Sequence, residues 1–181
     1  MGLDVTAYAR IKKLDAVFDE DGEPIDPTTR EPLEYDFKAY RNPDFPGRAD
    51  DIEDRAIYWA ENAVSLYAGY GGYNVWREEL ARVAGYQKGK YKQFGRDWDS
   101  HCVGCWSGAT GPFSELINFS DCEGTIGPSI CAKLARDFAD FDERAKAHDG
   151  VPGRPGWFYE LYQEFRTAFE MAADSGAVHF H

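Results

Sequence analysis

Positive charge is scarce in this sequence, and the shortage narrows the range of partners. The 181 residues include 20 Lys and Arg against 32 Asp and Glu, which gives a formal net charge of −12. An acidic surface repels phosphate backbones and anionic lipids unless a local basic patch overcomes the repulsion. The sequence contains no such patch. We therefore expect a protein or a small molecule as partner, with no nucleic acid and no membrane.

Long apolar runs are missing as well. The longest uncharged stretches, at 62–76 and 100–114, are rich in Gly, Ser and Tyr. Both are shorter than the roughly 20 apolar residues that a membrane-spanning helix needs. The first residues lack the basic region and the apolar stretch of a signal or transit peptide. The sequence therefore predicts a cytoplasmic protein without a membrane segment.

Cysteine is the third scarce residue, with four copies in the chain. Cys102 and Cys105 form one Cys-x-x-Cys pair beside His101, which is half of a tetrahedral zinc signature. Cys122 and Cys131 do not repeat that spacing, and Cys131 falls on the apolar stripe of an expected helix. Zinc binding, a redox pair and reduced structural thiols remain open. The reduced thiols are favoured, and they require no cofactor.

The first half of the chain predicts strands and loops followed by a helix. Residues 3–11 alternate larger apolar side chains with small or polar ones, which indicates a strand. Residues 19–51 are rich in Asp, Gly and Pro and predict a long acidic loop region. Residues 56–68 fit a helix or a hairpin, and their aromatic and β-branched residues favour the hairpin. A helix is expected at 73–84, and a surface loop at 86–99.

The second half predicts further helices and a closing strand. A short helix is expected around 113–117, a longer one from Pro128 to about Ala147, and a third at 157–173. Residues 177–181 fit a strand. The whole pattern indicates one α+β domain over 1–181, built on an antiparallel sheet that includes the N- and C-terminal strands and is packed by three or four amphipathic helices.

Two carboxylates flank a thiol in the turn Asp121-Cys122-Glu123-Gly124, just before an expected helix start. Acidic groups near a helix N-terminus can be structural caps, because the helix dipole stabilises negative charge there. The same groups could bind a cation, accept hydrogen bonds from a ligand or act as a general base. Capping is favoured, and Asp121, Cys122 and Glu123 remain candidates for ligand binding.

A glycine turn precedes the first expected helix in the segment 70–77. The helix N-terminus could hold an anion, and Arg77 could bind a planar anion through two hydrogen bonds. No Gly-Lys-Ser or Gly-Lys-Thr follows, so the usual triphosphate loop is excluded. An internal ion pair of Arg77 with Asp121 or Glu123 is the favoured alternative. The ligand-binding candidates of this segment are Tyr70, Tyr73, Asn74 and Arg77.

Two histidines lie two positions apart in the closing strand. Strand periodicity places His179 and His181 on one face, with Val178 and Phe180 on the other. The apolar face must meet the core, so we expect the histidines to be partly solvated. Such a pair can chelate a metal, but a solvated strand end is favoured. The full set of metal candidates is His101, Cys102, Cys105, Cys122, His179 and His181.

Four segments carry a resemblance to a known family: MGLDVTAY at 1–8, YGGYNVWR at 70–77, FSELINFSDCEG at 113–124 and AADSGAVHFH at 172–181. In these segments the chain resembles a family of small uncharacterised bacterial and prophage proteins. The resemblance spans most of the chain apart from the loop at 19–50. It implies a single whole-chain domain of phage or prophage origin, and it brings no activity, cofactor or catalytic residue.

The charge of −12 and the lack of a complete catalytic constellation favour a non-enzymatic binding protein that engages a host protein or a small ligand. A small hydrolase or transferase using Asp121 and Glu123 is the alternative, so enzymatic activity remains open. A third hypothesis is a scaffold stabilised by zinc.

Overall fold

A four-stranded antiparallel sheet forms the centre of the computed structural model, which describes residues 2–119 and 124–181. The strands in spatial order are β10 (Gly124–Ile126), β11 (Ala177–Phe180), β1 (Gly2–Ala9) and β7 (Asn62–Gly69). The expected α+β class and the sheet containing the N- and C-terminal strands are confirmed. The three-residue strand β10 was not expected from the sequence.

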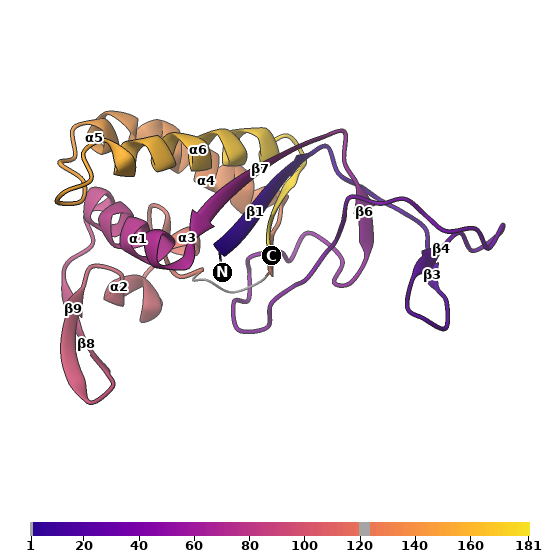
Figure 1. Cartoon of the computed structure of the whole chain (residues 1–181), viewed down its shortest axis with the longest axis horizontal. Helices are drawn as coiled ribbons and strands as arrows, with labels where there is room; N and C mark the ends of the chain where they lie inside the picture. The colour runs from indigo at the N-terminus through magenta and orange to yellow at the C-terminus, as the bar shows by residue number, and fades with distance from the viewer. Residues whose placement is uncertain (1, 120–123) are drawn as a thin grey trace.

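The long helices gather on one face of this sheet (Figure 1). They are α1 (Tyr70–Ala84), α4 (Pro128–Asp140) and α6 (Trp157–Ala172), with the short helices α2 (Val103–Trp106), α3 (Ser114–Ile117) and α5 (Asp142–Lys146) beside them. The helix expected from Pro128 to Ala147 is broken into two at Phe141. Gly85 ends α1 in the left-handed conformation, with φ 91°, where glycine is favoured.

Alternation along β1 separates the two faces of the sheet. Leu3, Val5 and Ala7 are fully buried against the helices, whereas Tyr8 packs in a second cluster on the opposite face. Side chains of a strand point to alternate faces, so a single strand serves both cores.

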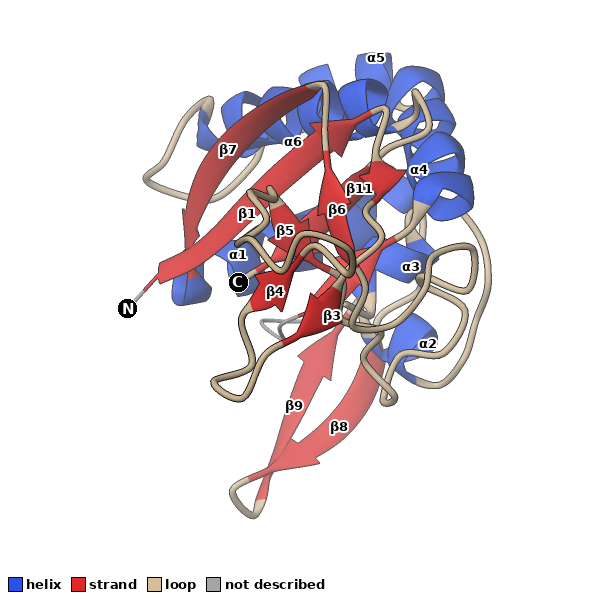
Figure 2. Ribbon diagram, turned by 90° about the vertical axis from the view of Figure 1, so that its right-hand side faces the viewer, coloured by secondary structure: helices blue, strands red, loops and turns tan. Residues whose placement is uncertain are grey.

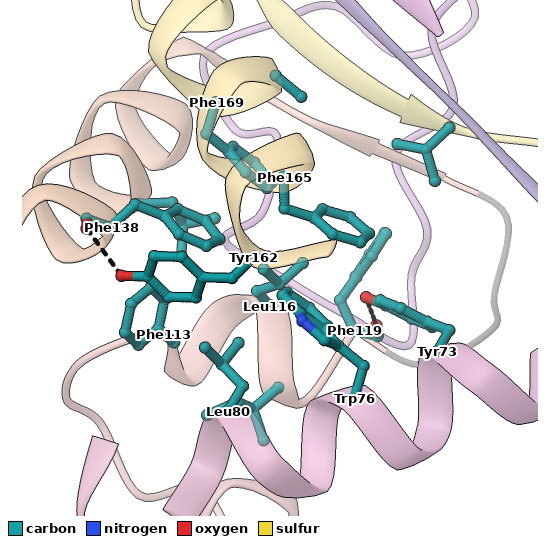
Figure 3. Packing of buried hydrophobic residues seen from close by; sticks show 14 of the residues in the cluster. Tyr73, Trp76, Leu80, Phe113, Leu116, Phe119, Phe138, Tyr162, Phe165 and Phe169 are labelled. Atoms are coloured by element: carbon teal, nitrogen blue, oxygen red, sulfur yellow. Dashed lines mark hydrogen bonds between the residues drawn. The ribbon is translucent and has the colours of Figure 1, made fainter. Parts of the chain in front are cut away.

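Aromatic side chains fill the core between the sheet and the helices (Figure 3). The ring of Trp76 on α1 stacks on Phe165 of α6, with 4.4 Å between ring centroids. The Tyr162 hydroxyl donates a hydrogen bond to the carbonyl of Phe138, at 2.7 Å, which ties α6 to α4. The ring nitrogen of Trp76 donates to the carbonyl of Phe158 at 3.3 Å, so both buried side chains keep their polar atoms paired.

Short strands from the first third of the chain cover part of the other face of the sheet. They are β2 (Lys12–Lys13), β3 (Val17–Phe18), β4 (Pro24–Ile25), β5 (Phe37–Lys38) and β6 (Ile57–Trp59). Phe37 stacks between Tyr8 and Tyr58, at 4.4 and 5.3 Å between ring centroids. The β3–β4 pair extends away from this layer (Figure 1).

The segment 56–68 forms two strands, as favoured, but the expected hairpin pairing is wrong. Strand β6 pairs with β2 and β5, whereas β7 pairs with β1. The chain changes sheets at Ala60, whose amide donates to the Asp36 carboxylate at 2.6 Å. Tyr58 packs in the second cluster, where it stacks on Phe37, and this contact favours the pairing of β6 with β5 over a hairpin with β7.

The surface loop expected at 86–99 is instead a hairpin of β8 (Gly89–Gln93) and β9 (Arg96–Ser100). Its two-residue turn places Phe94 and Gly95 at φ 51° and 73°, the signs that a type I′ turn requires. The hairpin projects from the body beside α2 (Figure 1). In the part of the chain that the structure describes, no helix is both long and apolar enough to cross a membrane.

Candidate functional site

A groove of about 590 Å³ lies where α1, the β8–β9 hairpin and α2 meet. We call it the α1 groove. Its lining residues are Asn74, Val75, Arg77, Glu78, Lys88, Tyr91, Gln93, Asp99, Ser100, Cys102 and Trp106. Two of the ligand-binding candidates, Asn74 and Arg77, therefore line a cavity together.

Arg77 is the most unusual residue of the α1 groove. Its side chain is buried, with 4% of the residue exposed. Nη1 donates to the carbonyl of Ile117 at 2.7 Å, and Nη2 donates to Oδ1 of Asn74. The guanidinium lies over the ring of Tyr73, with 5.0 Å from Cζ to the ring centroid.

The positive charge of Arg77 lacks a counter-ion in the part of the chain that the structure describes. None of the carboxylates at 2–119 and 124–181 forms an ion pair with it, and Nε is buried without a hydrogen-bond partner. A buried charge without a counter-ion is costly. A negatively charged group bound in the groove would offset that cost.

Glu78 is the acid next to Arg77, but its carboxylate is engaged elsewhere. It accepts hydrogen bonds from the Ser100 hydroxyl and, at 3.0 Å, from the amide of His101. The Ser100 hydroxyl oxygen in turn accepts from the amide of Cys102 at 3.0 Å. These bonds fix the turn from β9 into α2 and so hold one wall of the groove.

The cysteines around the groove are buried thiols. Cys102 and Cys105 are free, as is Cys131, the third cysteine that the structure describes. Burial raises the pKa of the Cys102 thiol to about 12 and also raises the pKa of Cys105. Both side chains therefore stay protonated near neutral pH, which disfavours nucleophilic attack. The neighbouring His101 directs Nδ1 to the carbonyl of Tyr86, at 2.7 Å.

Aromatic rings form the outer wall of the groove. Tyr91 on β8 and Trp106 at the end of α2 meet edge to face, with 5.2 Å between ring centroids. Lys88 adds an exposed positive charge just before β8. The groove thus combines two cations, two side-chain amides, an apolar wall and the carboxylates of Glu78 and the exposed Asp99. Because Glu78 is held by Ser100 and the His101 amide, Arg77 is left to interact with a small acidic ligand.

Tyr73 lies in the core and does not line the groove. It is fully buried, and its hydroxyl donates to the carbonyl of Phe119 at 2.9 Å (Figure 3). Through Tyr73 and Arg77, α1 therefore holds the backbone of residues 117–119. The central motif of the sequence thus lies against the residues that lead into the acidic turn.

Several sequence candidates fall where the structure gives no description. Asp121, Cys122 and Glu123 lie outside the described residues, and so does the favoured ion pair between Arg77 and one of these carboxylates. Tyr70 is the first residue of α1, but its side chain also lies outside the described part.

His179 and His181 face a different cavity, which we call the sheet-face pocket. It has a volume of about 510 Å³ and is also lined by Lys38 and Arg55. His179 Nδ1 lies 2.9 Å from the Thr125 hydroxyl, and the two imidazole centroids are 4.7 Å apart. Burial, with a smaller contribution from His181, lowers the pKa of His179 to about 4.

Three of the metal candidates line these two cavities, and His101 and Cys105 line neither of them. Cys102 lines the α1 groove, whereas His179 and His181 line the sheet-face pocket among two cations. Residues 2–119 and 124–181 contain no group of three or more His, Cys, Asp or Glu side chains placed to hold a metal ion.

Sequence reasoning missed most of the wall opposite α1. Tyr91 and Ser100 belong to the hairpin and Lys88 directly precedes it, in a region where a surface loop was expected at 86–99. The register pairs Lys90 with Asp99 and Lys92 with Asp97. The hairpin could have been predicted from these lysines and aspartates, which lie at equal distances on either side of Phe94-Gly95.

No protein-family model, curated protein or solved structure matches this chain. The groove must therefore be interpreted from its own geometry.

Proposed function

We propose that the protein is a cytoplasmic, non-enzymatic binding protein for a small acidic ligand, held in the α1 groove with Arg77 as the anchor for the acid group. The supporting observation is the guanidinium of Arg77, which is buried beside a cavity without a carboxylate partner among the described residues.

The groove favours an acid attached to a ring. A carboxylate or phosphate near Arg77 would receive a charge-assisted hydrogen bond in a site of low dielectric constant. Lys88 adds attraction at the rim, and the edge-to-face pair of Tyr91 and Trp106 offers apolar contact to a planar body.

Binding accounts for these side chains better than catalysis. The Cys102 thiol has a raised pKa and is a weak nucleophile at neutral pH. The Glu78 carboxylate is occupied by Ser100 and the His101 amide, so it lacks the freedom of a general base. Cys102 and Glu78 instead form part of the rigid wall of the α1 groove.

The test is a calorimetric titration of the full chain with phenyl phosphate and with benzoate, and with benzylamine as the cationic control. We expect the acids to bind and benzylamine not to bind. Arg77→Lys keeps the charge but loses the planar fork, and should weaken acid binding at least tenfold. Lys88→Gln should weaken it about threefold, whereas Lys92→Gln, on the same hairpin but outside the groove lining, should change nothing.

Two results would contradict the proposal. One is equal weakening by Lys88→Gln and Lys92→Gln, which would mean unspecific charge attraction. The other concerns the acidic turn: if Arg77 forms an internal ion pair there, the double variant Asp121→Asn, Glu123→Gln removes it. If that variant binds the acids and the natural chain does not, Arg77 is a structural residue.

A further inference from the structure

The two edge strands of the central sheet differ in whether backbone from outside the sheet bonds to them. At the β10 edge, the amide of Thr125 donates to the carbonyl of Tyr40 at 2.8 Å, and the amide of Gly127 donates to Arg48 at 2.7 Å. The opposite edge is β7, which pairs with β1 alone among the described residues. Figure 2 shows β7 as the outer strand of the sheet.

Nothing in the sequence of β7 protects its open edge. Natural edge strands are usually short, or carry lysine, proline or a bulge that prevents another strand from adding. The eight residues Asn62–Gly69 contain no charge and no proline. They pair with β1 in an unbroken register. Alternate amides and carbonyls along this edge are therefore available to an added strand.

A groove accompanies the edge along most of its length. Cavities of about 460 and 340 Å³ lie between β7 and α6 and share Tyr67 and Glu164 in their linings. Val64 is 38% exposed and Tyr67 is 63% exposed, although both are large apolar residues. The register places Val64 opposite Ala7 on the helix side of the sheet and Tyr67 opposite Asp4 on the other side. The alternating side chains of an extended segment paired with β7 would therefore contact one residue on each face.

The charge beside the edge selects the kind of segment. Glu160 and Glu164 on α6 line the groove and are exposed, and neither forms an ion pair within the described residues. The cation at one end, Arg154, lies over the ring of Trp157. A second copy of this chain would bring the same carboxylates to the interface and has the same net charge of −12, so a basic partner fits better.

We infer that β7 and its groove bind an extended lysine- or arginine-bearing segment of a partner protein, which adds to the sheet as a fifth strand. This surface is separate from the α1 groove and does not depend on Arg77. Backbone pairing supplies the affinity, and the carboxylates of α6 select for basic side chains.

The probe is a fluorescent octapeptide of alternating Thr and Lys, compared with one of alternating Thr and Glu. We expect the lysine peptide to bind the full chain at least tenfold more tightly. Hydrogen exchange should show new protection of amides within residues 62–69. Absence of binding, or binding without protection in β7, would overturn the inference.

Backbone pairing is tested with two further peptides, in which alternate amides are N-methylated in one parity or the other. An added strand turns only one set of its amides toward β7. One methylated peptide should therefore lose binding while the other retains it. Equal affinity of the two would show that charge alone holds the peptide.

The double variant Glu160→Gln, Glu164→Gln tests whether these carboxylates select for basic side chains. It should lower the affinity for the lysine peptide at least fivefold. Its matched control is Glu20→Gln, Glu31→Gln, which removes the same charge from the distant acidic loop and should leave affinity unchanged. Arg77→Lys should also have no effect. If sedimentation shows a dimer whose β7 amides are protected without peptide, the edge serves a second copy and the inference fails.

Discussion

Gly176 lies in the turn between α6 and β11, where this turn passes close to the end of β1. A Cβ atom on Gly176 would lie 1.9 Å from the carbonyl oxygen of Tyr8 and 2.8 Å from that of Ala172. This close approach is held by hydrogen bonds from the amides of Arg10 and Ile11 to the carbonyls of Asp174 and Ser175. Neither backbone can yield without loss of these bonds, so the glycine is required by close approach.

Gly176→Ala should therefore destabilise the protein by roughly 2–3 kcal/mol, the cost of forcing extra volume into packed structure. Urea unfolding measures the change. The matched control is Gly71→Ala in the first turns of α1, where a Cβ meets nothing within 4 Å. That variant should be neutral or stabilising by up to about 1 kcal/mol. Similar losses in the two variants would contradict the close-approach argument.

His179 predicts a specific loss of stability in acid. Its pKa is lowered to about 4 in the folded protein, first by burial and then by His181, from an ordinary value of 6.5. As pH falls from 6.5 towards 4, the unfolded chain binds the proton first, so the free energy of unfolding falls. Above pH 6.5 the residue contributes no pH dependence. The full loss is of the order of 3 kcal/mol.

Urea unfolding at pH 4.5, 5.5 and 6.5 checks this expectation. His179→Gln should make the free energy of unfolding less dependent on pH over that window. His181→Gln should keep most of the dependence, because it removes only the smaller cause. Identical slopes for the natural chain and His179→Gln would show that other groups account for the acid sensitivity.

At the level of elements, the β8–β9 hairpin projects from the body of the protein and contributes little to its core. Most of its residues are exposed on both faces. It contacts the body at Gly89, where a Cβ would lie 2.8 Å from the side chain of Val103, at Tyr91, which meets Trp106, and at Ser100, which donates to Glu78. A two-stranded hairpin without a buried face adds little stability of its own.

Replacing residues 91–98 by Asn-Gly should therefore lower the free energy of unfolding by only about 1 kcal/mol, the scale of the lost Tyr91–Trp106 contact. The same change removes the aromatic wall of the α1 groove and should weaken phenyl phosphate binding at least tenfold. Urea unfolding and calorimetry measure the two effects. A loss above about 3 kcal/mol would mean that the hairpin belongs to the core.

The elements also show what could be predicted from the sequence. Helices α1 and α6 bury a continuous apolar stripe, so their periodicity was plain. Strand β10 has three residues, too few for any period, and is placed by pairing with the distant β11. The pairing of β6 depends on Tyr58 stacking with Phe37. Such long-range contacts leave no local pattern.

The candidate site was predictable to a similar degree. Arg77 and Asn74 were found because a glycine turn before a helix, followed by arginine, suggested anion binding. The burial of Arg77 depends on α3, whose Ile117 carbonyl accepts its hydrogen bond from 40 positions away. The hairpin wall was missed because charged residues exposed on both faces give no apolar alternation.

At the scale of the whole molecule, the charge of −12 opposes folding through self-repulsion. Added salt screens this repulsion over about 10 Å at 0.1 M. We expect the melting temperature to rise between 10 and 150 mM NaCl. The triple variant Glu20→Gln, Asp21→Asn, Glu23→Gln should melt higher than the natural chain at low salt and equally at 0.5 M. A melting temperature that falls with salt would show that ion pairs outweigh the repulsion.

The central position of β1 has a consequence for synthesis. Thr6 meets His181 from 175 positions away, whereas its other neighbour, Ser65, is 59 positions away. On the ribosome, β1 and β7 can pair early, but the side of β1 that receives β11 stays open until residues 177–180 have been made. Completion of the sheet is therefore a late, long-range event, and the nascent chain carries two unpaired strand edges until then.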